Sequence, residues 1–469
     1  ITPITPITPI TPITPITPKP TDQCPMPEAL PFVLFGLVFL LILFGFPVAF
    51  TLGGVSVLFG LAFLEPALLN AVSFRIFGVM TNVVLIAVPL FVFMGVMLEK
   101  SGLAERMLET IGLLFGRLRG GLAIAVIVVG TLLAASTGIV GATVITMGLI
   151  SLPTMLKRGY SIELATGTIA ASGTLGQIIP PSIVLVLLAD TITNSAQAGG
   201  SADVGAMFAA ALLPGLLLVV GYIVYVLVLV RIKPQVAPPM PAEEVAAFRD
   251  NHFWGKLVSA FVLPALLIVA VLGSIFAGIA SPTEAAAVGA LGATLLTLAT
   301  KGRKGFTLTL LNGVMRETTK ISTMVFTILL GATVFSLVFR GLGGPDTLTR
   351  WIEAANLGPQ GFLLLVMLLI FVAGFFIDFI EIIFIFVPVV VPIFDQFGID
   401  LVWVGILFAL NLQTSFLSPP FGFSLFYLKG VAPPEVTTQH LYRGIVPYLV
   451  LQVVFLLVVV LFPEVLGVG

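Results

Sequence analysis

Two short polar segments interrupt long apolar runs of the chain, and both have residue types that can bind ions inside a membrane. The first, Ser172–Ile183, reads SGTLGQIIPPSI, and the second, Asn411–Gly422, reads NLQTSFLSPPFG. Each contains two adjacent prolines, which remove two backbone donors and keep the preceding residue out of helical geometry. A membrane helix should therefore break in each segment. The carbonyl and amide groups freed by a break are tolerated only where the backbone lines a cavity or is buried in protein.

The two breaks form a matched pair. Pro180 and Pro419 stand 239 positions apart. Interrupted segments at corresponding positions of two halves are typical of the binding site of a secondary transporter. The alternative is that both proline pairs kink helices for packing only. Their pairing favours a site.

Candidate ligand oxygens gather at the breaks and in two further apolar stretches, 121–156 and 360–396. Carbonyl groups and the C-termini of half-helices suit Na⁺, whereas helix N-termini suit anionic groups. The first cluster consists of small and hydroxyl-bearing residues: Ser136, Thr137, Gly138, Gly141, Ser172, Gly173, Thr174 and Gly176. The second cluster consists of acids, amides and hydroxyls: Asp378, Glu381, Asn411, Gln413, Thr414, Ser415 and Ser418. Scattered Ser and Thr more often hydrogen-bond between packed helices, so only their clustering at breaks favours ligand roles.

Asp378 and Glu381 are carboxylates in an otherwise apolar run. A charged group at that depth costs about 3 kcal/mol or more unless it is compensated. The pair is consistent with a functional site. It is equally consistent with pairing to a distant arginine or with a place near the outer surface.

The composition identifies the elements that must position these residues. Of the 469 residues 58% are hydrophobic and 9% are charged, against about 25% charged in a soluble domain. The chain is therefore expected to be an all-α polytopic membrane protein. Apolar runs long enough to span a bilayer, about 20 residues each, are expected near 31–49, 51–66, 80–98, 160–189, 205–230, 257–280, 282–300, 318–340, 400–428 and 443–462.

Several classes of function find no support in the sequence. Two histidines and one cysteine argue against a His/Cys metal site, and a net charge of −1 argues against a nucleic-acid partner. No nucleotide-binding loop of the GxxxxGK[ST] type is present. An intramembrane enzyme would need a catalytic set, but His252 and His440 both fall in polar loops. A channel would need a continuous polar pore rather than two local clusters.

The chain divides into two similar halves joined by a polar connector. The halves are residues 30–230 and 257–469, the connector is 231–256, and each half holds five expected spans. At the offset of 239, Pro153 matches Pro392 and Gly159 matches Gly398. An odd number of spans per half inverts the second copy, as in many secondary transporters. Residues 1–29 precede the halves, and their six Ile-Thr-Pro repeats predict an extended polyproline II segment to which no function is assigned.

Charge is consistent with the inversion. Lys157-Arg158 follows the first extra stretch, whereas Asp395 and Asp400 follow the second. Lys and Arg gather on the cytoplasmic side, so the two copies should face opposite sides with the connector inside. Arg340 and Arg350 are misfits, because this scheme places them outside.

The stretches 121–156 and 360–396 are too long for one span and lack a polar turn on the far side. Ser136–Gly138 interrupts the first midway, and Phe375–Ile377, followed by Asp378, occupies the same place in the second. Re-entrant hairpins, whose two arms enter and leave on one face, explain both. Two ordinary spans with a tight turn are the alternative, but they would break the inversion.

Four long runs in the chain carry a family resemblance. They are AASTGIVGA, GYSIELATGTIAASGTLGQIIPPSI, FFIDFIEI and NLQTSFLSPPFGFSLFYLKGVAP. From about residue 30 to its end, the chain resembles the large membrane subunit of tripartite ATP-independent periplasmic (TRAP) transporters. The resemblance implies a bacterial or archaeal inner-membrane symporter driven by Na⁺ and moving in an elevator-like manner. It also implies a small four-helix membrane subunit as partner, a soluble periplasmic binding protein and an organic-acid substrate.

The resemblance further implies where the ligands bind. One Na⁺ site would join Ser136–Gly138 to Ser172–Gly176, and the other would join Phe376–Asp378 to Asn411–Ser415. The second tip is bulky and acidic rather than rich in Ser and Gly. The substrate would lie between the two tips, within reach of Ser136, Thr137, Gln177, Glu381, Gln413 and Ser418. A related carboxylate symporter, coupled to Na⁺ or H⁺ and working without a binding protein, remains the alternative function.

Overall fold

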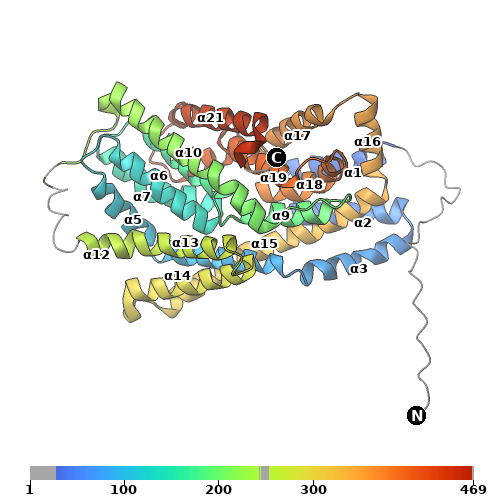
Figure 1. The fold of residues 1–469 in the computed structure, drawn as a ribbon, viewed down its shortest axis with the longest axis horizontal. Helices are drawn as coiled ribbons and strands as arrows, with labels where there is room; N and C mark the ends of the chain where they lie inside the picture. The colour runs from blue at the N-terminus through green and yellow to red at the C-terminus, as the bar shows by residue number, and fades with distance from the viewer. Residues whose placement is uncertain (1–27, 242, 244–252, 467–469) are drawn as a thin grey trace, which may run out of the picture.

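The structure is a computed structural model that describes residues 28–241, 243 and 253–466 (Figure 1). Within these ranges the chain forms helices and no strand. Seven helices are long and apolar enough to cross a membrane, or up to nine if each of two bent pairs counts as one span. The prediction of an all-α polytopic membrane protein is confirmed.

The first half begins with helices on the periphery and ends with a long helix. Its elements are α1 (Leu30–Leu43), α2 (Val48–Phe63), α3 (Pro66–Met80), η1 (Val84–Ile86), α4 (Ala87–Lys100), α5 (Leu103–Leu114), α6 (Gly121–Thr137), α7 (Val140–Lys157), α8 (Ile162–Thr174), η2 (Leu175–Gln177), α9 (Ile183–Ser195) and α10 (Val204–Ile232).

The second half follows the short turn η3 (Pro234–Val236) and the connector. Its elements are α12 (Phe253–Leu257), η4 (Val258–Val262), α13 (Leu263–Phe276), α14 (Pro282–Gly305), α15 (Leu308–Gly341), α16 (Gly344–Ala354), α17 (Pro359–Ala373), α18 (Phe379–Gln396), α19 (Leu401–Leu417), α20 (Phe423–Val431), α21 (Thr438–Leu461) and η5 (Pro463–Leu466).

The sequence analysis missed helix α3. The expected spans leave residues 67–79 without a helix. In the structure, α3 and the helix that follows form a bent pair at an angle of 55°. Asn70 and Arg75 lower the hydropathy of α3, and for that reason no apolar run was recognised. Two short helices, α5 and α16, were not expected as elements either. In α5 the residues Leu103, Met107 and Ile111 are buried on one face, as amphipathic spacing requires.

Helices of the two halves correspond at the offset of 239. Both ends of α7 and both ends of α18 differ by that number, as do the starts of α8 and α19. The bent pair α3–α4 corresponds to the single 34-residue helix α15. In Figure 1, α5 to α7 lie toward the left and α16 and α17 toward the right. The inverted arrangement of the halves across a bilayer stays a prediction.

Helices of one half pack against helices of the other half in the core. Helix α7 packs against α20, and α18 packs against α9, so each hairpin contacts the broken helix of the other half. Helices α8, α10 and α21 are joined by buried hydrogen bonds: Thr168 and Tyr448 hydroxyls lie 2.6 Å apart, and Gln452 Nε2 donates to Tyr222 Oη at 2.8 Å. These bonds lower the cost of burying the three hydroxyls and the Gln452 amide N–H, whereas Gln452 Oε1 has no partner among the described residues.

Hydrogen bonds between charged side chains and backbone groups join the two halves. The Lys100 ammonium donates to Gly313 O at 3.3 Å, and Lys301 donates to Lys100 O at 3.4 Å. Asp395 accepts backbone N–H groups of the loop after α9, including Gln197 N at 2.6 Å and Gly200 N at 3.1 Å. The carboxylate of α18 therefore anchors a loop of the first half.

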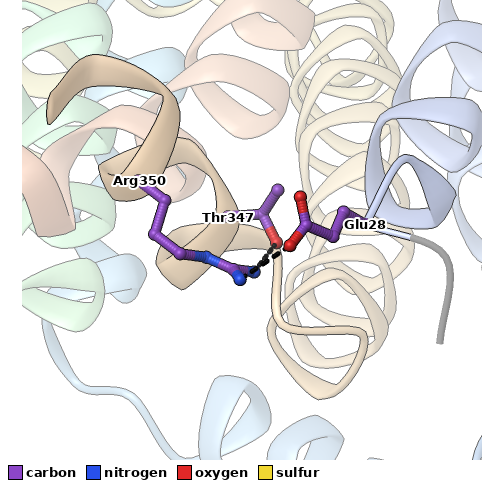
Figure 2. A network of polar contacts seen from close by, with 3 residues as sticks. All are labelled: Glu28, Thr347 and Arg350. Atoms are coloured by element: carbon purple, nitrogen blue, oxygen red, sulfur yellow. Dashed lines mark hydrogen bonds and ion pairs between the residues drawn. The ribbon is translucent and has the colours of Figure 1, made fainter. Parts of the chain in front are cut away.

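Arg350, one of the two arginines that did not fit the charge pattern, is exposed and paired. Its guanidinium donates to Glu28 Oε1 at 2.8 Å and to Thr347 Oγ1 at 3.2 Å (Figure 2). Glu28 belongs to the segment expected to be an extended tail, but it stands directly before α1. Residues 1–27, with the Ile-Thr-Pro repeats, lie outside the described residues.

Gly176 permits a close approach between α6 and the break after α8. A Cβ at this position would lie 2.4 Å from the carbonyl oxygen of Ala134. We expect Gly176→Ala to destabilise the protein by about 1–3 kcal/mol, the usual cost of overpacking, and to lower the thermal midpoint in detergent by at least about 2 °C. Gly221→Ala in α10 is the control, because nothing lies within 4 Å of the added methyl. Equal midpoints for the two variants would contradict the close packing.

The membrane topology is tested by single-cysteine labelling in a Cys24→Ser background. Lys157 and Phe397 are both exposed, at the base of α7 and after α18. We expect a membrane-impermeant maleimide to label Phe397→Cys from outside whole cells and Lys157→Cys only after the cells are opened, because of the charge asymmetry of the repeats. Labelling of both from the same side would refute the inverted repeat.

Candidate functional site

The first hairpin ends in a turn buried within the protein. Helix α6 ends at Thr137, Gly138 takes a left-handed backbone conformation with φ of 61°, and α7 begins at Val140. Ser136 and Thr137 are only 2% and 3% exposed. A Cβ at Gly138 would lie 3.0 Å from the backbone nitrogen of Ile183. The tip therefore meets the N-terminus of α9, the second part of the first broken helix.

The hydroxyls predicted for the first ion site do not all lie at this contact, because Ser172 Oγ faces Gly130 of α6, before the tip. Ser136 Oγ donates to Leu133 O at 2.8 Å, Ser172 Oγ to Ile169 O at 3.1 Å and Thr174 Oγ1 to Ala171 O at 2.9 Å. Each bond uses the hydroxyl proton and leaves oxygen lone pairs available. Thr137 Oγ1 instead lies 2.8 Å from Thr143 Oγ1 within the hairpin. Gly141 does not face the break and packs against the ring of Tyr427.

At the second hairpin the two acids cap their own helix. Asp378 is the N-cap of α18 and forms a capping box with Glu381, whose Oε2 accepts the backbone N–H of Asp378 at 3.2 Å. A capping box satisfies two orphan donors at a helix start. Among the described residues the two acids form no ion pair with an arginine. Their compensation is the N-terminus of α18.

The remaining residues of the second cluster separate into two groups. Ser415 lies at the tip, since a Cβ at Gly374 would come 2.1 Å from its Oγ. Asn411 lies farther along, where its amide donates to Met367 O at 2.7 Å. Thr414 and Ser418 donate to backbone carbonyls of their own segment. The Phe376 side chain is 46% exposed and contacts the Phe421 ring, so only its backbone is suited to an ion site.

Between the two clusters lies a buried polar centre formed by Thr174, Gln177 and Gln413. Gln413 Nε2 lies 3.5 Å from Thr174 Oγ1, and the two residues are 239 positions apart, so the halves meet here. Both amide atoms of Gln177 and Oε1 of Gln413 are fully buried and have no hydrogen-bond partner among the described residues. An unsatisfied buried polar group costs about 1–3 kcal/mol. Such a cost is expected where a ligand supplies the partner.

Tyr427 is a site residue that the sequence analysis did not single out. Its ring contacts Gly141 behind the first tip, and Asp378 and Glu381 lie within electrostatic range of its hydroxyl. Tyr427 therefore stands between the two hairpins. In the sequence, Tyr427 lies eight residues after Pro419. Because several phenylalanines surround it, it looks like one more apolar aromatic residue.

The donor set is composed mainly of neutral oxygens. Among the described residues no three His, Cys, Asp or Glu side chains form a group that could hold a metal ion. Hydroxyl and carbonyl oxygens are hard ligands that suit an alkali cation better than a transition metal. The N-termini of α9 and α20 have no side-chain cap, so their amides remain available to an anionic group.

Comparison with known proteins places the chain among membrane transporters. A family model described as the tripartite ATP-independent periplasmic transporter, DctM component, matches residues 35–465. The C4-dicarboxylate TRAP transporter large permease protein of Rhodobacter capsulatus is 31% identical over 442 residues, which cover 92% of this chain and 97% of the relative. The sialic acid TRAP transporter large permease protein of Vibrio cholerae is 30% identical over 420 residues, which cover 90% and 93%.

A solved structure supports the fold. The Alcanivorax borkumensis YdaH transporter, described as having an unusual topology, aligns with a TM-score of 0.62 and covers 92% of this chain and 98% of its own. At 15% sequence identity this likeness concerns the fold alone. With the family match over nearly the whole chain, the resemblance and the membrane location expected from the sequence are confirmed. The chain belongs to the family of large inner-membrane permease subunits, the DctM component, of TRAP transporters, and its function is transport rather than enzymatic catalysis.

Proposed function

We propose that this chain imports a small organic acid in symport with Na⁺. The acid is delivered by a soluble periplasmic binding protein, and a small four-helix membrane subunit accompanies the permease. The observation that carries the proposal is the buried polar centre at Thr174, Gln177 and Gln413, with a hairpin tip and a broken helix on either side.

Na⁺ fits the first cluster because of its oxygens. A cation between the tip at 136–138 and the break at 172–176 would take carbonyl and hydroxyl oxygens from both segments. The Ser136 and Ser172 hydroxyl protons already point to carbonyls, so no proton would compete with it. Its oxygens would come from both the tip and the break. Binding would thereby tie the hairpin to the broken helix, as the elevator-like movement of one unit requires.

The second ion site would be asymmetric with the first. It would use the backbone near Phe376 and the hydroxyl of Ser415, which lies against Gly374. The carboxylates of Asp378 and Glu381 would add negative charge nearby while they cap α18. A cation there therefore gains from charge that the first site does not have.

The substrate of this chain would be an organic acid bound between the tips. The uncapped N-termini of α9 and α20 favour a carboxylate, and the unpaired amides of Gln177 and Gln413 can bind its polar groups. A single dicarboxylate could use both helix ends. The acidic capping box at α18 disfavours an anion at that third helix end.

The proposal is tested by Na⁺ titration of uptake. Uptake driven by a Na⁺ gradient should stop when K⁺ replaces Na⁺. Ser136→Ala or Ser172→Ala removes one oxygen from the first ion site and leaves the carbonyls. Each should raise the half-saturating Na⁺ concentration about tenfold, or roughly 1.4 kcal/mol. The apparent affinity for the acid should fall in parallel at limiting Na⁺, by linkage.

Ser151→Ala is the matched control. Ser151 is buried in the same hairpin, and its Oγ has no partner among the described residues, so its loss should change neither folding nor the titration. Undiminished uptake in K⁺ would refute Na⁺ coupling. An equal shift in all three variants would show that these hydroxyls serve packing.

A further inference from the structure

A cavity with both polar and apolar lining residues lies away from the hairpin tips. It has a volume of about 230 Å³ and is enclosed by α3 and α15 on one side and by α9 and α18 on the other. We call it the arginine cavity and define it by Arg75, Asn82, Asp190, Thr191, Ser336 and Arg340. Arg340 is the second arginine that the charge pattern left unexplained. Unlike Arg350, it has no carboxylate partner among the described residues.

The polar atoms of the arginine cavity are incompletely satisfied. Arg340 Nη2 reaches Ser195 O only at 3.5 Å, and its buried Nε has no partner in the described part of the chain. Thr191 is 7% exposed, and its Oγ1 also lacks a partner there. Donors and hydroxyls left free on facing helices indicate a ligand that is bound between them.

The charge of the cavity selects an anion. Its lining holds two arginines and one acid, Asp190. Asp190 is already engaged, since Asn82 Nδ2 donates to its Oδ1 at 2.6 Å. Arg75 and Arg340 both line the cavity, so two like charges repel each other within one small space. An anion between them would remove that repulsion, and a planar guanidinium binds a carboxylate through two parallel hydrogen bonds.

We propose that the arginine cavity binds a carboxylate of the transported acid before it reaches the hairpin tips. The inference rests on the proposed transport of organic acids. The cavity adjoins Phe384 and Pro388 of α18, whose N-terminus bears the second tip. It lies at the end of α9 where Asp395 holds the following loop, which is the outer end in the predicted topology. At about 230 Å³ it is smaller than most ligand pockets, so it suits a small acid or one carboxylate end of a larger one.

The test measures the cavity directly in the purified full chain, in K⁺ medium and without a gradient. Ser336→Cys in a Cys24→Ser background places a thiol one helical turn before Arg340. An anionic methanethiosulfonate should react faster than a cationic one, relative to free thiol. Arg340→Gln should reduce that preference at least tenfold. Arg350→Gln is the control, because Arg350 is an exposed arginine that does not line the cavity.

Carboxylate binding is tested by protection with succinate. Succinate should slow modification of Ser336→Cys when Arg340 is present and not in Arg340→Gln. Arg340→Lys should retain the preference for the anionic reagent but lose the protection by succinate. A lysine keeps the positive charge, but it lacks the planar guanidinium that binds a carboxylate through two hydrogen bonds. Equal protection by KCl at the same ionic strength would show a simple halide site and overturn the inference. A preference for the cationic reagent would also overturn it, as would failure of both Ser336→Cys and Thr333→Cys to react.

This outcome is independent of coupling. Na⁺-driven uptake without any protection by succinate would leave the proposed function intact and remove the inference. Protection by succinate together with uptake that does not depend on Na⁺ would support the carboxylate site and refute the proposed Na⁺ coupling.

Discussion

The fold depends on the requirement that backbone polar groups inside an apolar protein find partners or line a cavity. The proline pairs at 180–181 and 419–420 violate helical hydrogen bonding in two membrane-embedded segments. Each freed segment is covered by a hairpin tip, and Gly138, Gly176 and Gly374 permit contacts that a side chain would block. Each hairpin also packs against the broken helix of the other half: α7 packs on α20, and α18 packs on α9. The polar centre is the point where these constraints converge.

The same requirement explains why the two ion clusters differ. In the first cluster, the Ser136 and Ser172 hydroxyls donate to carbonyls three residues back and leave acceptor oxygens free. At the second tip, Asp378 and Glu381 satisfy the start of α18 themselves. One tip therefore offers neutral ligands and the other offers charge. Tyr427 stands between them and joins the two environments.

The sequence predicted the all-α polytopic class because hydropathy reports bilayer-spanning length directly. It also predicted the family, since its motifs are long. Helix α3 was missed because Asn70 and Arg75 interrupt its apolar pattern. The three-residue spacing of Asp378 and Glu381 is the sequence signature of a capping box, so their capping role was predictable. The sequence analysis weighed only the cost of burying their charge. The unpaired amide of Gln177 and the packing of each hairpin against the other half could not be predicted. Both depend on contacts between segments that are distant in the sequence.

We propose above that the first tip and the first break bind one Na⁺ together. The most direct measurement is a cryo-electron microscopy structure of the complete transporter at a resolution that shows ions, determined once in Na⁺ and once with K⁺ in its place. In Na⁺ we expect a density bounded by oxygens from both Ser136–Gly138 and Ser172–Gly176, at about 2.4 Å, the distance expected for a hard cation of this size. That density should be absent in K⁺. The same side-chain packing in both conditions, with no density between tip and break, would contradict this proposal.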